Sequence, residues 1–343
     1  MNASHFAPAG RGVVDRAATT GRHLAFLRRL ALLCAVLVLV ITSLSAFIRL
    51  SKAGLSCADR PDCYGQNLRQ LQQGLAATAG EDAGTAAARL AHRVVASSAL
   101  LLVITMVAVC LTARPLLWRE GRVALALLVL ALFLAVLGRW SANPRVPAVT
   151  IGNLLGGFAM LALCWRLARR GDDCATPWLR AWAGVGVAVL AAQVALGGLL
   201  SASYAATSCT GFAECIEASA GVPWSALDPW REPVLSPAPP INAAGALVQT
   251  VHRLSGLGAA LVLLALGVAA LRSRRRVAGA LLLALLAAEL LLGLQMAGTL
   301  SLVLALLHNV IAALLLAVAF DLTRGAAPGT GLEAAASSQS SRP

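Results

Sequence analysis

The sequence predicts an all-α integral membrane protein with eight transmembrane helices, arranged as two tandem four-helix bundles related by a pseudo-two-fold axis along the membrane normal. Three observations predict this fold. Of the 343 residues, 59% are hydrophobic and only 13% are charged, whereas a soluble domain is about half apolar and a quarter charged. The apolar residues gather in eight runs, and motifs recur in the same order in the two halves. An ordinary cytosolic enzyme is therefore excluded.

The eight apolar runs are the candidate transmembrane helices, since a helix needs roughly 20 apolar residues to cross the hydrocarbon core. The third run is short, and the connection between the seventh and eighth runs, near Gly298, is tight. In order, the runs cover residues 30–50, 90–112, 123–137, 148–167, 179–202, 246–271, 277–296 and 301–322.

Arginines cluster before the first run and between runs two and three, four and five, and six and seven. Cytoplasmic connections are enriched in Lys and Arg, so this pattern predicts that both termini lie in the cytoplasm. The membrane is expected to be a bacterial inner membrane. The connection between runs three and four, with Arg139 and Arg145, is a minor exception. The net charge of +13 follows from these clusters, and the basic residues do not interleave with aromatic ones as nucleic-acid binding would require.

The chain divides into four parts on this reading. Residues 1–23 form a basic cytoplasmic N-terminus, and the composition of this segment leaves a mitochondrial transit segment open. Residues 24–170 form the first bundle, with a long outer connection at 51–89. Residues 171–324 form the second bundle, with its outer connection at 203–245. Residues 325–343, rich in Ala, Gly and Ser, are expected to be disordered.

Each long outer connection contains a cysteine pair with the same spacing, Cys57 with Cys63 and Cys209 with Cys215. The periplasmic side of a membrane is oxidising, which favours two structural disulfides. A redox-active pair and free thiols are the alternatives, and zinc is disfavoured because no histidine lies near either pair. The remaining cysteines are interpreted as apolar packing residues, namely Cys34, Cys110, Cys164 and Cys174.

The two halves repeat one another. The segment SAFIRLSKAGLSC at residues 45–57 is matched in position by GGLLSASYAATSC at residues 197–209, and His92-Arg93 is matched by His252-Arg253. Both halves start inside, so the repeat is parallel. A glycine also precedes a polar residue by fifteen positions in each half, as Gly138 and Asn153 and as Gly293 and His308.

Three histidines, His92, His252 and His308, fall inside the predicted spans at a similar depth toward the outer face. An intramembrane histidine can be a helix-packing hydrogen-bond partner. Two at equivalent depth in one four-helix bundle can instead bind a b-type haem from opposite sides. Arg93 and Arg253 each follow a histidine, and could either pair with haem propionates or extend to the interface.

The first half lacks a match for His308, because Asn153 occupies the equivalent position. Asparagine is a poor iron ligand, so a pocket with His92 as its one histidine suits a substrate haem better than a permanent electron carrier; alternatively, this pocket has lost its haem. Glu289 and Gln193 each lie four residues before a glycine. Glu289 either handles protons or forms a hydrogen bond to a neighbouring helix.

The sequence resembles the haem A synthases in three places. Residues 49–66, RLSKAGLSCADRPDCYGQ, are similar to the first outer loop of that family, and residues 251–254, VHRL, and 308–317, HNVIAALLLA, to the haem-ligand segments of its C-terminal half. The resemblance implies that the chain oxidises the C8 methyl group of haem O to a formyl group, giving haem A for terminal cytochrome oxidase.

The resemblance also implies roles for particular residues. His252 and His308 would ligate a prosthetic haem b, and His92 would face the substrate haem, with Asn153 and Glu289 as further candidate catalytic residues. The family usually has a second histidine at the position of Asn153. It also often has a glutamate at the position of Arg89. The two outer-loop cysteine pairs would be the family's disulfides, the first tied to activity or haem transfer.

The partners implied are haem O, delivered by a haem O synthase, membrane lipid and an unidentified electron-transfer partner, and a homo-oligomer is compatible with this reading. Two other functions fit part of the sequence. A membrane b-type cytochrome could relay electrons without modifying haem, although its haems would be expected at different depths. A haem transporter or chaperone would fit the repeat, although the spans lack the interrupted helix pairs of transporter sites.

Overall fold

The computed structural model describes residues 9–56, 63–74, 83–140, 146–169, 175–297 and 299–325. All regular secondary structure within these residues is helical. The long helices are α1 (Ala9–Lys52), α3 (Ala83–Thr112), α4 (Trp118–Trp140), α5 (Pro147–Ala168), α6 (Pro177–Ala202), α8 (Gly245–Leu271), α9 (Arg276–Met296) and α10 (Leu302–Asp321). The short helices are α2 (Gln66–Gln72), α7 (Phe212–Ser219) and the 3₁₀ turns η1 (Ala205–Thr207) and η2 (Trp224–Leu227).

Eight of the described helices are long and apolar enough to cross a membrane, which confirms the predicted number of spans. Three helices, α1, α3 and α4, begin well before their apolar runs, because alanine and charged residues continue a helix that hydropathy alone does not mark. Thus α3 begins at Ala83 rather than at residue 90, which places His92 more than two turns into its helix rather than in the first turn. Helix α1 likewise includes His23, which the sequence analysis placed outside the span.

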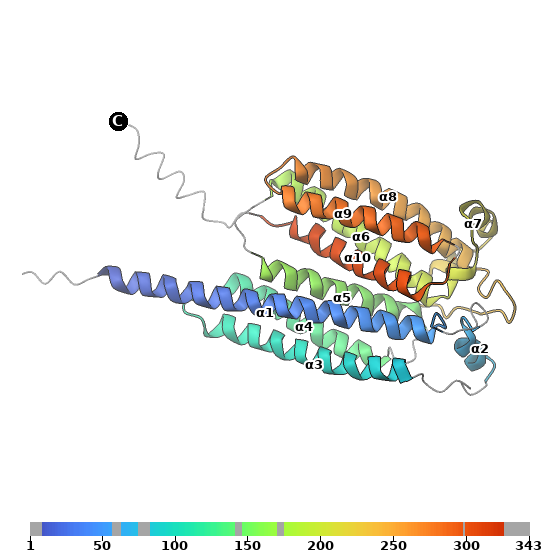
Figure 1. The fold of residues 1–343 in the computed structure, drawn as a ribbon, viewed down its shortest axis with the longest axis horizontal. Helices are drawn as coiled ribbons and strands as arrows, with labels where there is room; N and C mark the ends of the chain where they lie inside the picture. The colour runs from blue at the N-terminus through green and yellow to red at the C-terminus, as the bar shows by residue number, and fades with distance from the viewer. Residues whose placement is uncertain are drawn as a thin grey trace, which may run out of the picture.

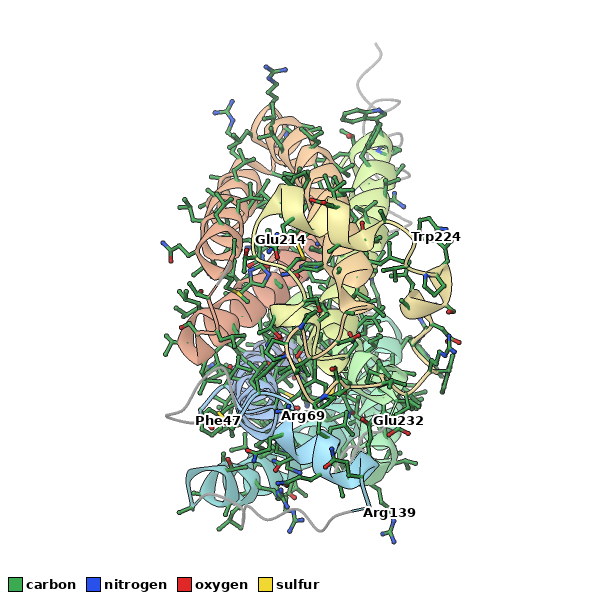
Figure 2. The ribbon with its side chains drawn as sticks, turned by 90° about the vertical axis from the view of Figure 1, so that its right-hand side faces the viewer. Phe47, Arg69, Arg139, Glu214, Trp224 and Glu232 are labelled. Carbon is green, nitrogen blue, oxygen red and sulfur yellow. A yellow bond between two sulfur atoms is a disulfide. The ribbon has the colours of Figure 1, made fainter. Side chains whose placement is uncertain are left out.

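The long helices group into two sets of four. Helices α1, α3, α4 and α5 form a closed ring of neighbours, and α6, α8, α9 and α10 form a second ring. The rings meet where α5 packs against α6 and α10, and where α1 packs against α10. Figure 1 shows that α1 begins and α10 ends at one end of the bundle, whereas α2 and α7 lie at the other end. An end-on view in Figure 2 separates the blue-to-green helices from the yellow-to-red ones.

One apolar core runs through both rings and across their junction. Its fully buried members include Cys34 of α1, Cys164 of α5, Leu282 of α9 and Leu315 of α10. The burial of Cys34 and Cys164 agrees with their prediction as packing residues. Large apolar side chains such as Leu261 remain exposed on the outside of the rings, as expected where the solvent is lipid rather than water.

The two outer connections pack on each other at the loop-bearing end. The Tyr64 and Tyr204 rings meet edge to face with their centroids 5.6 Å apart. The Arg69 guanidinium donates to the carbonyl of Pro237 at 3.0 Å, and the Gln72 amide donates to that of Pro233 at 2.8 Å. The connection that follows the first span is therefore fixed to the one that precedes α8, so the two halves share one cap.

A buried ionic cluster lies at the opposite end of the helices. The Asp321 carboxylate, only 2% exposed, accepts a hydrogen bond from Arg275 Nη2 at 2.5 Å. It forms ion pairs with Arg324 Nε at 2.8 Å and with Arg169 Nε at 3.6 Å. Arg324 also donates to backbone carbonyls at the C-terminal end of α5, those of Arg166 and Arg169. The carboxylate therefore joins the ends of α5, α9 and α10. From the sequence, the arginines at these ends indicated only which side of the membrane they face.

Replacement of Asp321 by asparagine should destabilise the protein strongly. The change leaves the buried Arg275 guanidinium facing a neutral amide, and breaking a buried ion pair on one side costs about 3–5 kcal/mol. The measurement is thermal and denaturant unfolding of the detergent-solubilised variant. Glu217→Gln, on the exposed face of α7, is the control and should unfold like the wild type. Equal stability of the two variants would mean that the cluster contributes nothing to the fold.

Candidate functional site

The second ring brings two predicted iron ligands into one bundle. His252 lies on α8 and His308 on α10, each about two turns from the N-terminal end of its helix. Helices α8 and α10 lie diagonally across the ring, since each packs against both α6 and α9. Both side chains are partly buried.

The His252 imidazole is in contact with a polar side chain from the neighbouring helix α6. Gln193 Nε2 lies 3.1 Å from His252 Nδ1 and donates to the His252 carbonyl oxygen at 2.9 Å. Ser255 Oγ donates to Gln193 Oε1 at 2.7 Å. From the sequence, Gln193 was placed four residues before a glycine without a role, and Ser255 was not singled out. Both are polar residues in membrane helices, and this property could have marked them as candidate site residues.

The His308 imidazole has an acidic partner on α9. Glu289 Oε1 lies 3.2 Å from His308 Nδ1, and the two side chains are 16% and 27% exposed. This contact places Glu289 beside a side chain of a neighbouring helix at ion-pair distance, while His308 Nδ1 has no hydrogen-bond partner among the described residues. Its role in proton handling stays a prediction.

Two glycines, Gly197 and Gly293, lie beside these imidazoles. A Cβ atom at Gly197 would be 3.2 Å from His252 Cε1, and one at Gly293 would be 3.7 Å from His308 Cε1. Each glycine is four residues, about one helical turn, beyond the polar partner of the same histidine. Helices α6 and α9 therefore both present a polar group and a glycine to an imidazole, which fits a pair of ligands oriented by their surroundings.

The first ring has the same frame with different side chains. His92 on α3 and Asn153 on α5 are both partly buried, on helices that lie diagonally across their ring. By the repeat offsets, Ile41 takes the place of Gln193 and Leu134 that of Glu289, and both pack against the apolar core. The first ring therefore has one histidine at these positions, and apolar residues replace both polar partners.

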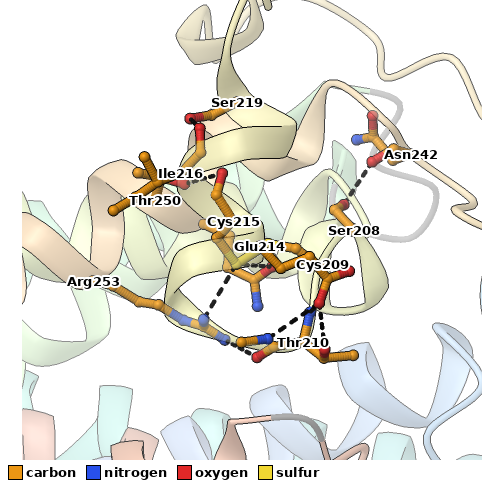
Figure 3. Close-up of a disulfide and its surroundings, with 12 residues drawn as sticks. Ser208, Cys209, Thr210, Glu214, Cys215, Ile216, Ser219, Asn242, Thr250 and Arg253 are labelled. Atoms are coloured by element: carbon orange, nitrogen blue, oxygen red, sulfur yellow. Dashed lines mark hydrogen bonds between the residues drawn. A yellow bond between two sulfur atoms is a disulfide. The ribbon is translucent and has the colours of Figure 1, made fainter.

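The disulfide between Cys209 and Cys215 is present and confirms that predicted pairing. Figure 3 shows it against the start of α8, where Thr250 Oγ1 donates to the Cys215 carbonyl oxygen at 2.9 Å. The Arg253 guanidinium donates to Cys215 Sγ at 3.2 Å and to the Thr210 carbonyl oxygen at 3.3 Å. The residue next to His252 is thus bound to the disulfide loop. A contact of Arg253 with a haem propionate stays a prediction.

The predicted roles of Arg93 and Cys57 remain predictions. Arg93 is exposed on α3, and its proposed contact with haem stays a prediction. Cys57 lies outside the described residues, so its pairing with Cys63 also stays a prediction.

Comparison with known proteins assigns the family. The COX15-CtaA family, described as cytochrome oxidase assembly protein, matches residues 28–320. The chain belongs to this family. It is also 31% identical over 207 residues to a Heme A synthase from Shewanella oneidensis, a match that covers 56% of this chain and 61% of that protein. The aligned part therefore spans less than two thirds of the relative's length. The family match covers all eight long helices in whole or in part and includes His92, His252 and His308.

Glu214 closes the loop that contains the disulfide in this family member. Its carboxylate accepts from the Thr210 hydroxyl, from the Thr210 backbone N–H at 3.0 Å and from the Gly211 N–H at 3.3 Å. These donors stabilise the ionised form and lower the pKa of Glu214 below its ordinary value of 4.5, with the Thr210 hydroxyl the largest cause. Nearby Arg253 lowers the pKa further.

The disulfide loop should therefore loosen in acid. A lowered pKa in the folded protein contributes stability above the ordinary value of 4.5, and this contribution is lost as the pH falls through the folded pKa. Reduction of Cys209–Cys215 by a phosphine, followed by alkylation and mass spectrometry, should become faster below about pH 4.5. Glu214→Gln should be reduced rapidly at every pH, whereas Glu217→Gln should follow the wild type. A pH-independent wild type would contradict the assignment of Glu214 as the group that closes the loop.

Proposed function

We propose that this protein is a haem A synthase, which oxidises the C8 methyl group of haem O to a formyl group through two successive hydroxylations. The observation that supports this most is the pair His252 and His308, which lie on helices diagonally across one ring, each with a polar side chain of a neighbouring helix beside Nδ1. Membership of the family and the similarity to a Heme A synthase support the reaction itself. The product, haem A, would serve the assembly of cytochrome oxidase.

His252 and His308 would hold the resident haem, and the residues present fit that group. Each imidazole has a polar side chain within 3.2 Å of Nδ1, Gln193 for His252 and Glu289 for His308, and a glycine beside its Cε1 atom. The haem would be of b type, because the sequence contains no Cys-x-x-Cys-His motif for covalent attachment. When bound, it supplies one-electron transfer. The protein orients the ligands, and the apolar core around them excludes water.

The first ring is the better candidate for the substrate haem O. His92 would face the substrate, and Asn153 would lie across from it in place of a second histidine. The apolar Ile41 and Leu134, where the other ring has Gln193 and Glu289, would leave the substrate without the held ligand pair that a permanent cofactor requires. A haem that must enter and leave is served better by such a pocket.

The two rings would be related by a pseudo-two-fold axis along the membrane normal, as the repeat suggests. Exchange of α1, α3, α4 and α5 with α6, α8, α9 and α10 carries every contact within one ring into a contact within the other. The same exchange turns the α1–α10 contact into the α6–α5 contact and leaves α5–α10 unchanged. Reciprocal contacts of this kind are what a two-fold axis produces.

The protein would lie in a bacterial inner membrane with the disulfide loops in the periplasm and both termini in the cytoplasm. The arginine-rich connections and the Asp321 cluster support the cytoplasmic assignment of their end. The expected partners are haem O, delivered by a haem O synthase, and a protein that exchanges electrons with the resident haem.

The reaction can be tested by haem analysis of membranes that contain this chain together with a haem O synthase, in a host that makes no haem A. Extraction and chromatography should give a haem A peak, and His92→Ala should abolish it because the substrate site has lost its histidine. His23→Ala is the matched control and should retain the peak, because His23 lies in the first half of α1, far along the helix from its outer-loop end at Lys52. Haem O and haem B alone, with a folded wild-type protein that contains haem, would favour an electron-relay cytochrome.

The resident haem can be tested separately by the absorption spectrum of the purified protein. Simultaneous replacement of His252 and His308 by alanine should abolish haem binding, since both proposed ligands are gone, whereas His92→Ala should keep the resident haem spectrum. Haem retained at the wild-type level by a folded double variant would contradict the assignment of the second ring.

A further inference from the structure

Arg49, near the outer-loop end of α1, has a guanidinium group without a counter-charge from the helices around it. The side chain is partly buried, and its Nε atom is buried with no hydrogen-bond partner in the described part of the chain. A charged group in a membrane helix is costly unless an opposite charge meets it. The four helices of the first ring contain two acids, Asp15 and Glu120, both near the starts of α1 and α4, at the end away from the outer loops.

The face of α1 that contains Arg49 is turned toward α5. Thr42 lies seven residues before Arg49, about two helical turns, and therefore on the same face. A Cβ atom on Gly157 of α5 would be 2.8 Å from Thr42 Cγ2, so this face packs on α5. Asn153 lies one turn from Gly157 toward the outer loops, and Arg49 is displaced from Thr42 in the same direction.

The repeat gives the depth of Arg49 relative to the histidine of its ring. Ser45 occupies the repeat position of Gly197, which lies beside the His252 imidazole. Arg49 is four residues, about one turn, beyond Ser45 toward the outer loops. Its repeat equivalent, Ser201 of α6, also has a buried side-chain oxygen with no hydrogen-bond partner among the described residues. Both rings therefore place such a donor one turn outside the level of their histidine.

The direction and the depth together place Arg49 at the interior of the first ring. Its face lies between Ser45, at the position that meets the histidine helix in the other ring, and Thr42, which meets α5. The two arginines that directly follow histidines are placed differently. Arg93 is exposed on α3, and Arg253 donates to the disulfide loop.

We propose that Arg49 binds a propionate carboxylate of the substrate haem in the first ring and so positions the substrate. The inference rests on the proposed function, because it assumes that haem O occupies this ring with its iron at the level of His92. The two propionates of a haem lie on one edge, and a guanidinium one turn outside the iron level meets that edge when the propionates point toward the outer loops. Arginine can donate two parallel hydrogen bonds to a carboxylate, and such a pair is stronger in an apolar environment than in water.

This contact would also orient the reacting group. The C8 methyl group of haem O is on the same pyrrole ring as one of the propionates. A guanidinium that holds this propionate fixes the rotation of the macrocycle within the ring of helices, and with it the position of the methyl group. Arg49 is therefore a substrate-positioning residue of the proposed reaction.

The test is the binding of added haem b and of its dimethyl ester to the purified, full-length protein with its resident haem in place. The ester keeps the iron and the macrocycle but has no carboxylate. Binding to the first ring is the absorbance change that His92→Ala abolishes. The wild type should bind haem b about tenfold more tightly than the ester, a difference of roughly 1.4 kcal/mol. Arg49→Gln should bind both compounds with the affinity that the wild type has for the ester.

Arg139→Gln is the matched control, because Arg139 lies at the same end of the first ring but is exposed and points away from it (Figure 2). It should keep the wild-type preference for haem b, and the resident haem spectrum reports the folding of each variant. Equal affinity of the wild type for haem b and the ester would overturn the inference without any variant, and so would a wild-type preference in folded Arg49→Gln. Both results leave the proposed function intact. A wild type that binds no added haem at His92 would overturn the proposed substrate site, and this inference with it.

Discussion

Hydrocarbon offers no hydrogen bonds, so a polar side chain within a membrane helix needs a partner inside the protein. Gln193 of α6 meets His252 of α8, and Glu289 of α9 meets His308 of α10. Since each pair joins two helices, it fixes how those helices are rotated about their own axes. A rotation that separated Glu289 from His308 would leave a carboxyl group without its partner in an apolar environment. The geometry of the proposed haem site and the packing of the second ring therefore depend on the same contacts.

The two rings show how one backbone frame supports two kinds of site. The ring contacts are equivalent, but Ile41, Leu134 and Asn153 occupy the positions of Gln193, Glu289 and His308. Apolar residues at the first two positions need no partner and simply extend the core. The proposal that the first ring takes the substrate rests on this difference in side chains. The repeat gives both rings the same helix contacts. A few side-chain differences separate the proposed substrate site of the first ring from the proposed resident haem site of the second.

The ends of the helices are secured in different ways. At the outer end, the two connections contact each other through Arg69 and Gln72, and the Cys209–Cys215 loop is bound to Arg253, next to His252. At the other end, the buried Asp321 carboxylate gathers arginines from three helices. At the outer end, the disulfide loop thus contacts α8, the helix of the proposed ligand His252. At the other end, Asp321 of α10 forms an ion pair with Arg169 at the end of α5, which joins the two rings.

The sequence by itself determined the eight spans, the repeat, the Cys209–Cys215 pairing and the histidines to examine, because hydropathy and spacing are local properties of the chain. It located the helix starts less well, since alanine-rich and charged turns continue α1 and α3 beyond their apolar runs. Only the tertiary structure decided that Gln193 faces His252, that Ser255 orients Gln193, and that Asp321 is buried among arginines. These contacts join residues on different helices, or depend on the direction in which a side chain turns, and both are set by helix packing rather than by local sequence.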